Sequence, residues 1–274
     1  MALELPDTKT LQLRFDEASG VLFVTLARPQ VKNAMSREMM EELEAVFEAV
    51  HERRDVRAVV LRGEGGNFCA GGDIKDMAAA RGAAAEPGLD PIAAYNRRFG
   101  HVISKIDRAP QVVVAVLEGA VLGGGFGLAC VADVAIATSD AEFGLPETGL
   151  GVPPAQIAPF LVRRIGVSNS IRLAVTGARF AGSTALALGV CHIVVQDSVA
   201  LERELTGALA QIRRCAPGAI AATKQIMLKV GEVPLDTLLD ESAALFAEAA
   251  RGPEGMEGMM AFLGKRKPSW ADPG

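Results

Sequence analysis

The first third of the chain alternates between short apolar runs and one long amphipathic segment. Residues 10–15 and 21–26 alternate apolar and polar positions, and Gly20 lies in the short connection between them. This pattern predicts a β-hairpin. Farther on, apolar side chains recur every three or four residues up to residue 53, behind Ser36, whose hydroxyl suits a helix N-cap. We therefore expect two antiparallel strands followed by a helix over residues 36–53.

The middle of the chain repeats a strand-and-helix pattern. Three β-branched runs, at residues 57–61, 112–116 and 134–137, are separated by segments with helical spacing. Such alternation is typical of β-α-β units and an α/β fold. Residues 78–90 are rich in Ala and Gly and lack both caps and an apolar period, so we expect a loop there.

The last part of the chain has helical spacing only. Helical periods run through residues 201–215, 219–230 and 235–250, and prolines stand near the breaks between them. We therefore expect an α/β core over residues 1–195 and a helical region over residues 196–274.

Composition and charge narrow the classes of protein. The chain has 274 residues, of which 50% are hydrophobic, and 28 basic residues against 33 acidic ones give a net charge of -5. A disordered chain and a basic, aromatic-rich nucleic-acid surface are both excluded. No apolar run reaches the ~20 residues of a membrane span, and the N-terminus has no basic leader. We expect a cytoplasmic globular protein without a nucleic-acid or membrane partner.

The positions of the cysteines indicate a packing role rather than disulfide formation or metal binding. Cys69, Cys130, Cys191 and Cys215 are far apart, form no CxxC pair and lie in apolar sequence. A reduced thiol in such surroundings behaves as a small hydrophobe. We expect four structural thiols, with no disulfide and no metal site.

Two glycine-rich turns, at residues 63–73 and 119–127, each follow an apolar strand. Neither ends in Gly-Lys-Ser/Thr, and neither has dinucleotide-binding spacing, so nucleotide-phosphate chemistry is disfavoured. The three glycines at 123–125 allow close approach of the backbone to a ligand, with amides that face an anionic oxygen. That is the physics of an oxyanion hole, although tight strand-to-helix junctions use the same residues.

Five motifs in order carry a family resemblance. They are residues 33–36 (NAMS), 68–74 (FCAGGDI), 119–125 (GAVLGGG), 143–147 (FGLPE) and 261–268 (AFLGKRKP). Together they resemble the enoyl-CoA hydratase/isomerase (crotonase) superfamily over essentially the whole chain. The resemblance implies a crotonase-like spiral of β-β-α units and a C-terminal helical region used in trimer assembly. It also implies an acyl-CoA thioester substrate, no cofactor beyond the coenzyme A that the substrate carries, and a homotrimer or a dimer of trimers.

The resemblance also implies roles for particular residues. Glu147 matches the catalytic acid/base, and the backbone amides of Ala70 and Gly124 match the two oxyanion-hole donors. The segments that hold the coenzyme A arm correspond to positions that include Gln30, Ala34, Gly72, Asp73 and Ile74, with Gln30 where the family often has Lys. Phe262 and Lys265 match tail positions that approach the adenosine phosphate, often from a neighbouring subunit.

Gly127 is the informative departure. Two-glutamate hydratases of this family carry their second catalytic glutamate there, whereas one glutamate is the pattern of Δ3,Δ2-enoyl-CoA isomerases. Glycine also leaves room for a bulky acyl group. The sequence around residues 146–160 resembles isohexenylglutaconyl-CoA hydratases of acyclic-terpene degradation and bacterial 3-methylglutaconyl-CoA hydratases. We therefore expect a hydratase of a branched, glutaconyl-type enoyl-CoA in terpene or leucine catabolism. The alternatives are an isomerase and a non-catalytic acyl-CoA-binding paralogue.

A second carboxylate on such a substrate needs a polar partner. Asn96, Arg97 and Arg98 lie on the stretch that lines the acyl pocket in relatives, and the competing interpretation is a solvated helix face. Glu118 stands where relatives often carry Asn, and is either a hydrogen-bonded group or a second acid. We interpret His101 as structural.

Overall fold

The computed structural model describes residues 3–83 and 90–271. Its centre is a six-stranded sheet in the order β1-β2-β3-β4-β6-β9, where β1 and β2 pair antiparallel and the other neighbours are parallel. A second, three-stranded sheet has the order β5-β7-β8. The larger sheet comprises β1 Leu11–Asp16, β2 Val21–Leu26, β3 Ala58–Gly63, β4 Val112–Leu117, β6 Val134–Thr138 and β9 Ile193–Val195. The smaller sheet comprises β5 Ala120–Leu122, β7 Glu142–Gly144 and β8 Arg179–Ala181.

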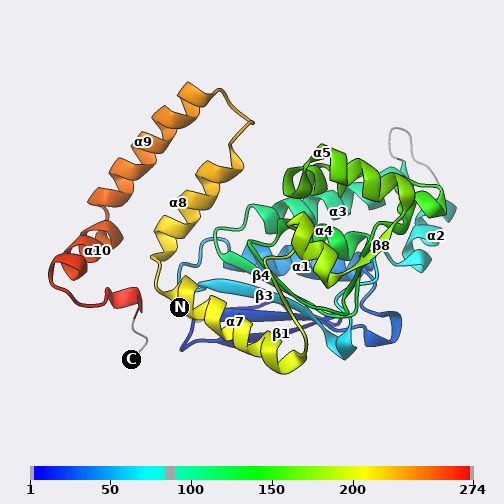
Figure 1. The fold of residues 1–274 in the computed structure, drawn as a ribbon, viewed down its shortest axis with the longest axis horizontal. Coiled ribbons are helices and arrows are strands. Elements are labelled where there is room, and N and C mark those ends of the chain that lie inside the picture. Colours follow the sequence, from blue (N-terminus) through cyan, green and yellow to red (C-terminus); the bar gives the residue numbers. More distant parts are fainter. Residues whose placement is uncertain (1–2, 84–89, 272–274) are drawn as a thin grey trace.

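Helices cover the sheet and continue into a helical tail (Figure 1). The helices of the body are α1 Arg37–Val50, α2 Ile74–Gly82, α3 Pro91–Asp107, α4 Gly124–Val131, α5 Ala158–Thr176 and α6 Gly182–Leu188. The later helices are α7 Ser198–Arg213, α8 Pro217–Leu228, α9 Leu235–Arg251 and α10 Pro253–Leu263. Short 3-10 turns are η1 Pro29–Val31, η2 Glu64–Gly66, η3 Pro146–Leu150 and η4 Ser269–Ala271. These elements confirm the expected α/β fold with a helical C-terminal part.

The local predictions for the first elements are confirmed. The antiparallel hairpin forms, and Ser36 caps α1 by accepting a hydrogen bond at its Oγ from the Met39 amide, 3.1 Å away. In β3, alternate side chains enter different cores: Val59 packs with α1 and α3 on one face, and Val60 packs with α7 on the other. Burial on both faces is why the central parallel strands are mostly apolar.

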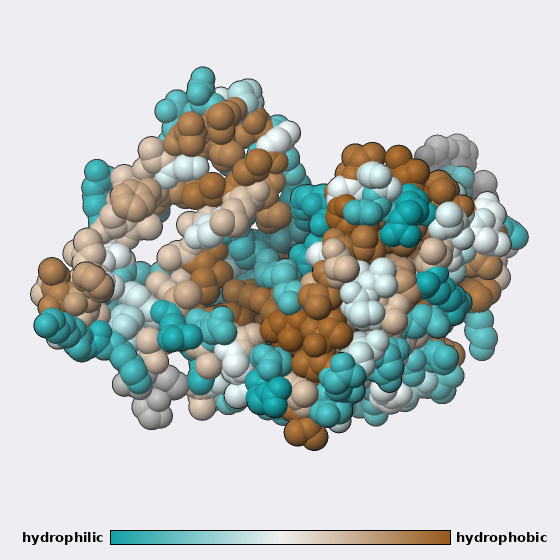
Figure 2. All heavy atoms as spheres, viewed as in Figure 1, coloured by the Kyte–Doolittle hydropathy of each residue, from teal (hydrophilic) through white to brown (hydrophobic). Residues whose placement is uncertain are grey.

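The tail projects from the body but is anchored at its base (Figure 1). The Lys224 ammonium of α8 donates to the Gln111 carbonyl at 2.9 Å and to the Asp133 carboxylate at 2.6 Å. The Arg57 guanidinium donates to main-chain carbonyls at the end of α7, including that of Cys215, and to the Trp270 carbonyl. Figure 2 shows apolar side chains gathered along the projecting helices.

Three expectations need correction. The loop predicted over residues 78–90 was wrong for residues 78–82, which belong to α2, while 84–89 lie outside the described residues. Alanine's high helix propensity and the Asp73 cap at the Lys75 amide explain a helix without an apolar stripe. The tail also contains α10, which was not expected as a separate helix. Of the four free thiols, Cys215 is exposed, so only the other three are packed as predicted.

None of the helices in the described part of the chain is long and apolar enough to cross a membrane. Within residues 3–83 and 90–271, no cluster of three or more His, Cys, Asp or Glu side chains is arranged to hold a metal ion.

Candidate active site

The two glycine-rich turns meet side by side. The Cys69 amide donates to the Ala120 carbonyl at 2.8 Å, and the Leu122 amide donates back to the Cys69 carbonyl at 2.9 Å. Just beyond this pairing, a Cβ placed on Gly123 would lie 3.4 Å from the Gly71 Cα. The backbone therefore brings residues 69–72 against the start of α4, where a side chain on either strand would separate them.

The amide of Gly72 faces the second turn. The Met35 amide donates to the Gly71 carbonyl at 2.7 Å, and the Met35 carbonyl accepts from the Asp73 amide at 3.0 Å. The Gly71 carbonyl and the Gly72 N–H belong to one trans peptide group and point in opposite directions, so the Gly72 N–H points away from Met35. A φ of +104° at Gly71 makes this turn of the backbone possible. The Gly72 N–H has no hydrogen-bond partner in the described part of the chain.

Ala70 does not supply the expected oxyanion-hole donor. Its amide donates to the Lys32 carbonyl at 2.9 Å, so its hydrogen is committed to the protein. The expectation named the wrong residue of the turn, because the side on which each amide emerges depends on the backbone reversal at Gly71. Gly72, expected only as part of the coenzyme A segment, carries the free amide instead.

Gly124 supplies a second free amide. It is the first residue of α4, so its N–H has no partner within the helix. The preceding Gly123, at φ +51°, donates instead to the Gly144 carbonyl at 3.0 Å and thereby turns the chain into the helix. A Cβ on Gly124 would lie 3.4 Å from Cζ of Phe99, so the ring lies next to Gly124.

Glu147 lies beside these amides. It is the second residue of η3, and its Oε1 lies 2.7 Å from the position that a Cβ on Gly123 would take. Its Oε2 is buried without a hydrogen-bond partner. Burial raises the pKa of this carboxyl above its ordinary value, with a weaker opposing backbone hydrogen bond. A carboxyl group with a free oxygen and a raised pKa is suited to proton transfer.

The space at Gly127 is filled, contrary to the expectation of extra room there. A Cβ on Gly127 would lie 3.1 Å from Cδ1 of Ile103 and 3.2 Å from Cγ1 of Ile157. Both isoleucines are buried, so the surroundings of Gly127 form an aliphatic wall. A second carboxylate at this position would have neither water nor a polar partner beside it. Phe99, Ile103 and Ile157 were not identified as candidate site residues from the sequence, although Phe99 and Ile103 have the four-residue spacing of one helix face.

The segments expected to hold the coenzyme A arm lie together. Residues 28–35 run beside residues 70–73, joined by the Met35 hydrogen bonds and by an ion pair of 2.8 Å between Arg28 and Asp73. Asp73 also caps α2, so its carboxylate is engaged within the protein. Ala34 accepts at its carbonyl from Arg28. Gln30, in η1, and Ile74, at the start of α2, are both exposed.

The two tail residues lie elsewhere. Phe262 is 84% exposed near the end of α10, and Lys265 follows that helix. Figure 1 shows α10 at the opposite end of the molecule from α2. Within one chain the structure therefore does not bring Phe262 and Lys265 to the other candidate substrate-binding residues.

The other polar residues considered from the sequence differ in whether they form ion pairs. The Glu118 carboxylate lies 3.5 Å from the Arg62 guanidinium, which favours the paired over the catalytic interpretation. Arg98 forms ion pairs with Glu41 and Glu44 of α1, at 3.4 and 3.8 Å. His101 is exposed on α3.

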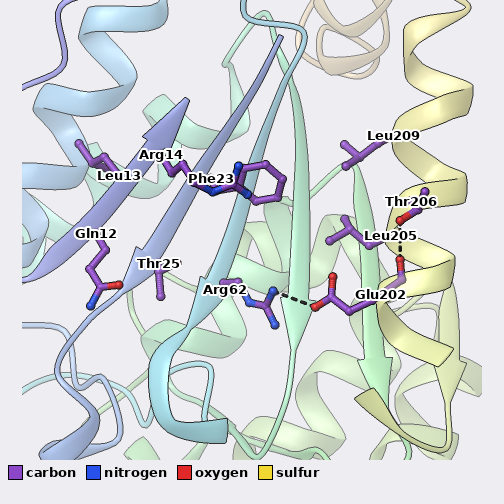
Figure 3. A pocket seen from close by; sticks show the side chains of 10 residues that line it. All are labelled: Gln12, Leu13, Arg14, Phe23, Thr25, Arg62, Glu202, Leu205, Thr206 and Leu209. Carbon is purple, nitrogen blue, oxygen red and sulfur yellow. Dashed lines mark hydrogen bonds and ion pairs between the residues drawn. The ribbon is translucent and has the colours of Figure 1, made fainter. Parts of the chain in front are cut away.

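A groove of about 460 Å³ lies elsewhere, between the outer face of β1 to β3 and α7 (Figure 3). Arg14 covers the Phe23 ring in it, and Arg62 is neutralised by Glu202 at 2.9 Å. The groove has neither the free amides nor Glu147 among its lining residues, and is separate from the candidate active site.

Two free amides beside a buried carboxyl, on a crotonase-like fold, define an enzyme class that acts on acyl thioesters. The family model for enoyl-CoA hydratase/isomerase matches residues 16–273, and the chain belongs to this family. The structure is similar to Pseudomonas aeruginosa AtuE, with 56% identity, a TM-score of 0.92, and coverage of 96% of this chain and 100% of that chain. It is also similar to an enoyl-CoA hydratase/isomerase from Marinobacter aquaeolei, with 50% identity, a TM-score of 0.93, and coverage of 96% and 99%.

A curated relative is a probable enoyl-CoA hydratase 2, mitochondrial, of Arabidopsis thaliana, with 32% identity over 91% of this chain and 81% of its own length. A probable enoyl-CoA hydratase of Bacillus subtilis is 29% identical over 95% of this chain and 98% of its own length. The chain is an enzyme of the enoyl-CoA hydratase type, with acyl-CoA thioesters as substrates.

Proposed function

We propose that the enzyme hydrates a branched enoyl-CoA of glutaconyl type, such as isohexenylglutaconyl-CoA or 3-methylglutaconyl-CoA. The observation that carries the reaction type is the unpaired, buried Oε2 of Glu147 beside two free backbone amides. The resemblance of residues 146–160 to hydratases of that branch supports the acyl class.

The amides of Gly72 and Gly124 hold the thioester oxygen in this proposal. Attack of water on C3 moves the π electrons toward that oxygen, and two preorganised N–H donors stabilise the resulting enolate. Losing one such donor typically costs ~3 kcal/mol of barrier. The Phe99 ring lies next to Gly124 and gives this side of the site an apolar wall.

Glu147 moves the proton. Its carboxylate removes one proton from the attacking water as the C3–O bond forms, and then delivers that proton to C2 as the enolate collapses. One oxygen and two hydrogens of water are thus added, and the carboxylate is regenerated. One carboxyl group suffices because its two roles follow each other, which the aliphatic wall at Gly127 requires.

The same aliphatic wall favours one competing function, a Δ3,Δ2-enoyl-CoA isomerase in which Glu147 carries a proton from C4 to C2 without water. The two reactions differ in the fate of solvent oxygen. We expect the purified enzyme in ¹⁸O-labelled water to place label at C3 of a glutaconyl-type substrate and to react poorly with crotonyl-CoA, as mass spectrometry of the product would measure. Rapid isomerisation of a 3-enoyl-CoA, with no label from any glutaconyl-type substrate, would contradict the hydratase proposal.

We further infer a cytoplasmic homotrimer or dimer of trimers, in which Phe262 and Lys265 reach the coenzyme A of a neighbouring subunit. Large apolar side chains on the projecting helices support association, with Phe246 76% and Leu239 56% exposed. The four free cysteines support a reducing compartment.

A further inference from the structure

One face of α3 follows the acyl side of the candidate active site. Phe99 lies next to Gly124, and Ile103, four residues later, fills the space at Gly127. Asn96 lies three residues before Phe99, so it continues the same face one turn beyond the ring. A ligand that extends from Gly124 past Phe99 therefore reaches the turn of α3 that carries Asn96 and its neighbour Arg97.

The segment that supplies Ile157 also supplies a polar partner to this turn. The Gln156 Nε2 donates to Asn96 Oδ1 at 3.1 Å, and Gln156 Oε1 accepts from Arg97 Nη1 at 3.5 Å. A Cβ on Gly100 would lie 2.0 Å from Gln156 Oε1 and 2.5 Å from Arg97 Nη1. The bare backbone at Gly100 thus lets these side chains form a cluster, called the polar cluster below, of Asn96, Arg97 and Gln156.

The polar cluster carries a positive charge without a counterion. Arg98, the next residue, is paired with two glutamates of α1, whereas Arg97 forms no ion pair with any described residue. Its one hydrogen bond in the described chain is the long contact to Gln156. A guanidinium has five N–H donors in a planar fork that matches a carboxylate. The amide nitrogen of Asn96 is a further free donor beside it.

The length of a glutaconyl chain fits this arrangement. Four carbon–carbon bonds of about 1.5 Å place the C5 carboxylate roughly 5 Å from C1. In the proposed pose, C1 lies at the Gly124 amide and the acyl chain extends past Phe99 toward the turn of α3 that carries the polar cluster. We propose that the polar cluster binds the distal carboxylate of a dicarboxylic enoyl-CoA, with Arg97 as the residue that determines specificity. This inference rests on the proposed function and names the acyl chemistry that the site selects.

The test compares a charged substrate with a neutral one of the same shape. Wild type, R97M and R98M would be assayed with 3-methylglutaconyl-CoA and with its 5-amide, by the loss of enoyl-thioester absorbance. We expect R97M to lower kcat/KM for the carboxylate substrate about 10- to 100-fold, the range for a lost charged hydrogen bond, and to change the amide less than about threefold. R98M is the matched control, because its charge is already paired on another face, and should leave both values within about threefold.

Equal losses on both substrates in R97M, or no loss on either, would overturn the carboxylate site. R97K should recover part of the loss, since the charge returns without the planar fork. A binding measurement distinguishes failure of the carboxylate site from failure of the proposed hydration. It uses calorimetry with glutaryl-CoA, which has no double bond to hydrate, and with its 5-amide. In one outcome the wild type hydrates no glutaconyl substrate and still binds glutaryl-CoA more tightly than its 5-amide, with R97M abolishing that difference. This result would support the carboxylate site and contradict the proposed hydration. The absence of that preference would overturn the site.

Discussion

At the scale of single residues, Glu147 and the glycines around it define the chemistry. The carboxyl has one oxygen near Gly123 and the other buried and unpaired. Burial without a partner makes the ionised form costly, which raises the pKa of this carboxyl above its ordinary value. The unpaired carboxyl lowers the stability of the fold. A carboxylate held by hydrogen bonds would transfer a proton less readily.

Glu147→Gln tests both consequences of that burial. We expect turnover to fall by ~10² to 10⁴, because the amide cannot carry the proton, while binding of the thioester remains. Near-normal turnover would contradict the proposed role of Glu147.

The same variant should also change the dependence of stability on pH. Since the folded-state pKa is raised, wild type loses stability as pH rises from the ordinary carboxyl range through the raised value. E147Q should therefore have the higher Tm at neutral pH, with the difference vanishing below the ordinary carboxyl range. Thermal unfolding over that range of pH measures it, and a difference independent of pH would contradict the buried ionisation.

At the scale of elements, α4 packs its N-terminal glycines against two different surfaces. A Cβ on Gly125 would lie 2.5 Å from the Cys69 carbonyl oxygen and 2.7 Å from the Cys69 Cβ. These atoms belong to the segment of residues 69–72, which carries the free amide of Gly72, so they cannot move without displacing it. At Gly127, on the same helix, the nearest atoms are the ends of two isoleucine side chains.

Gly125→Ala and Gly127→Ala therefore form a matched pair. Both gain helix propensity, but G125A forces the helix away from the first glycine turn. We expect G125A to lose about 1–3 kcal/mol of unfolding free energy and most activity, whereas G127A stays within about 1 kcal/mol of wild type. Chemical denaturation with an activity assay measures both, and equal stabilities would mean that the contact at Cys69 is not rigid.

At the scale of the whole molecule, the tail exposes an apolar surface that the body does not cover. Arg57 and Lys224 hold its base, while the outer helices extend away from the sheet (Figure 1). Exposed apolar area of this kind marks an association surface. The tail residues expected near coenzyme A, Phe262 and Lys265, stand on that projecting part.

Phe246→Glu tests whether the tail mediates assembly. We expect wild type to elute with the mass of a trimer or hexamer in size-exclusion chromatography with light scattering, and F246E to shift toward the monomer. Glu248→Lys, a charge change on the same helix at a polar position, is the control and should retain the wild-type mass. A monomeric wild type would contradict the assembly proposal.

Local patterns in the sequence were sufficient for the first elements of the chain and for the order of the motifs. The hairpin, the Ser36 cap and the two glycine turns follow from neighbours within a few residues, and each is present. The loop predicted over residues 78–90 was wrong for residues 78–82, because an alanine-rich helix with an Asp cap needs no apolar stripe. The role of Glu147 came from the family resemblance and remains a proposal.

The sequence alone determined the hairpin, the first helix, the central parallel strands and the helical character of the tail, because those choices depend on local propensity and periodicity. Tertiary structure decided which groups are free to act, because freedom depends on partners from remote segments. The Ala70 N–H donates to the Lys32 carbonyl and is not free, whereas the backbone conformation at Gly71 leaves the Gly72 N–H free. Arg97 and Arg98 are adjacent and chemically identical, yet only Arg98 meets glutamates of α1, since consecutive residues of a helix face different neighbours.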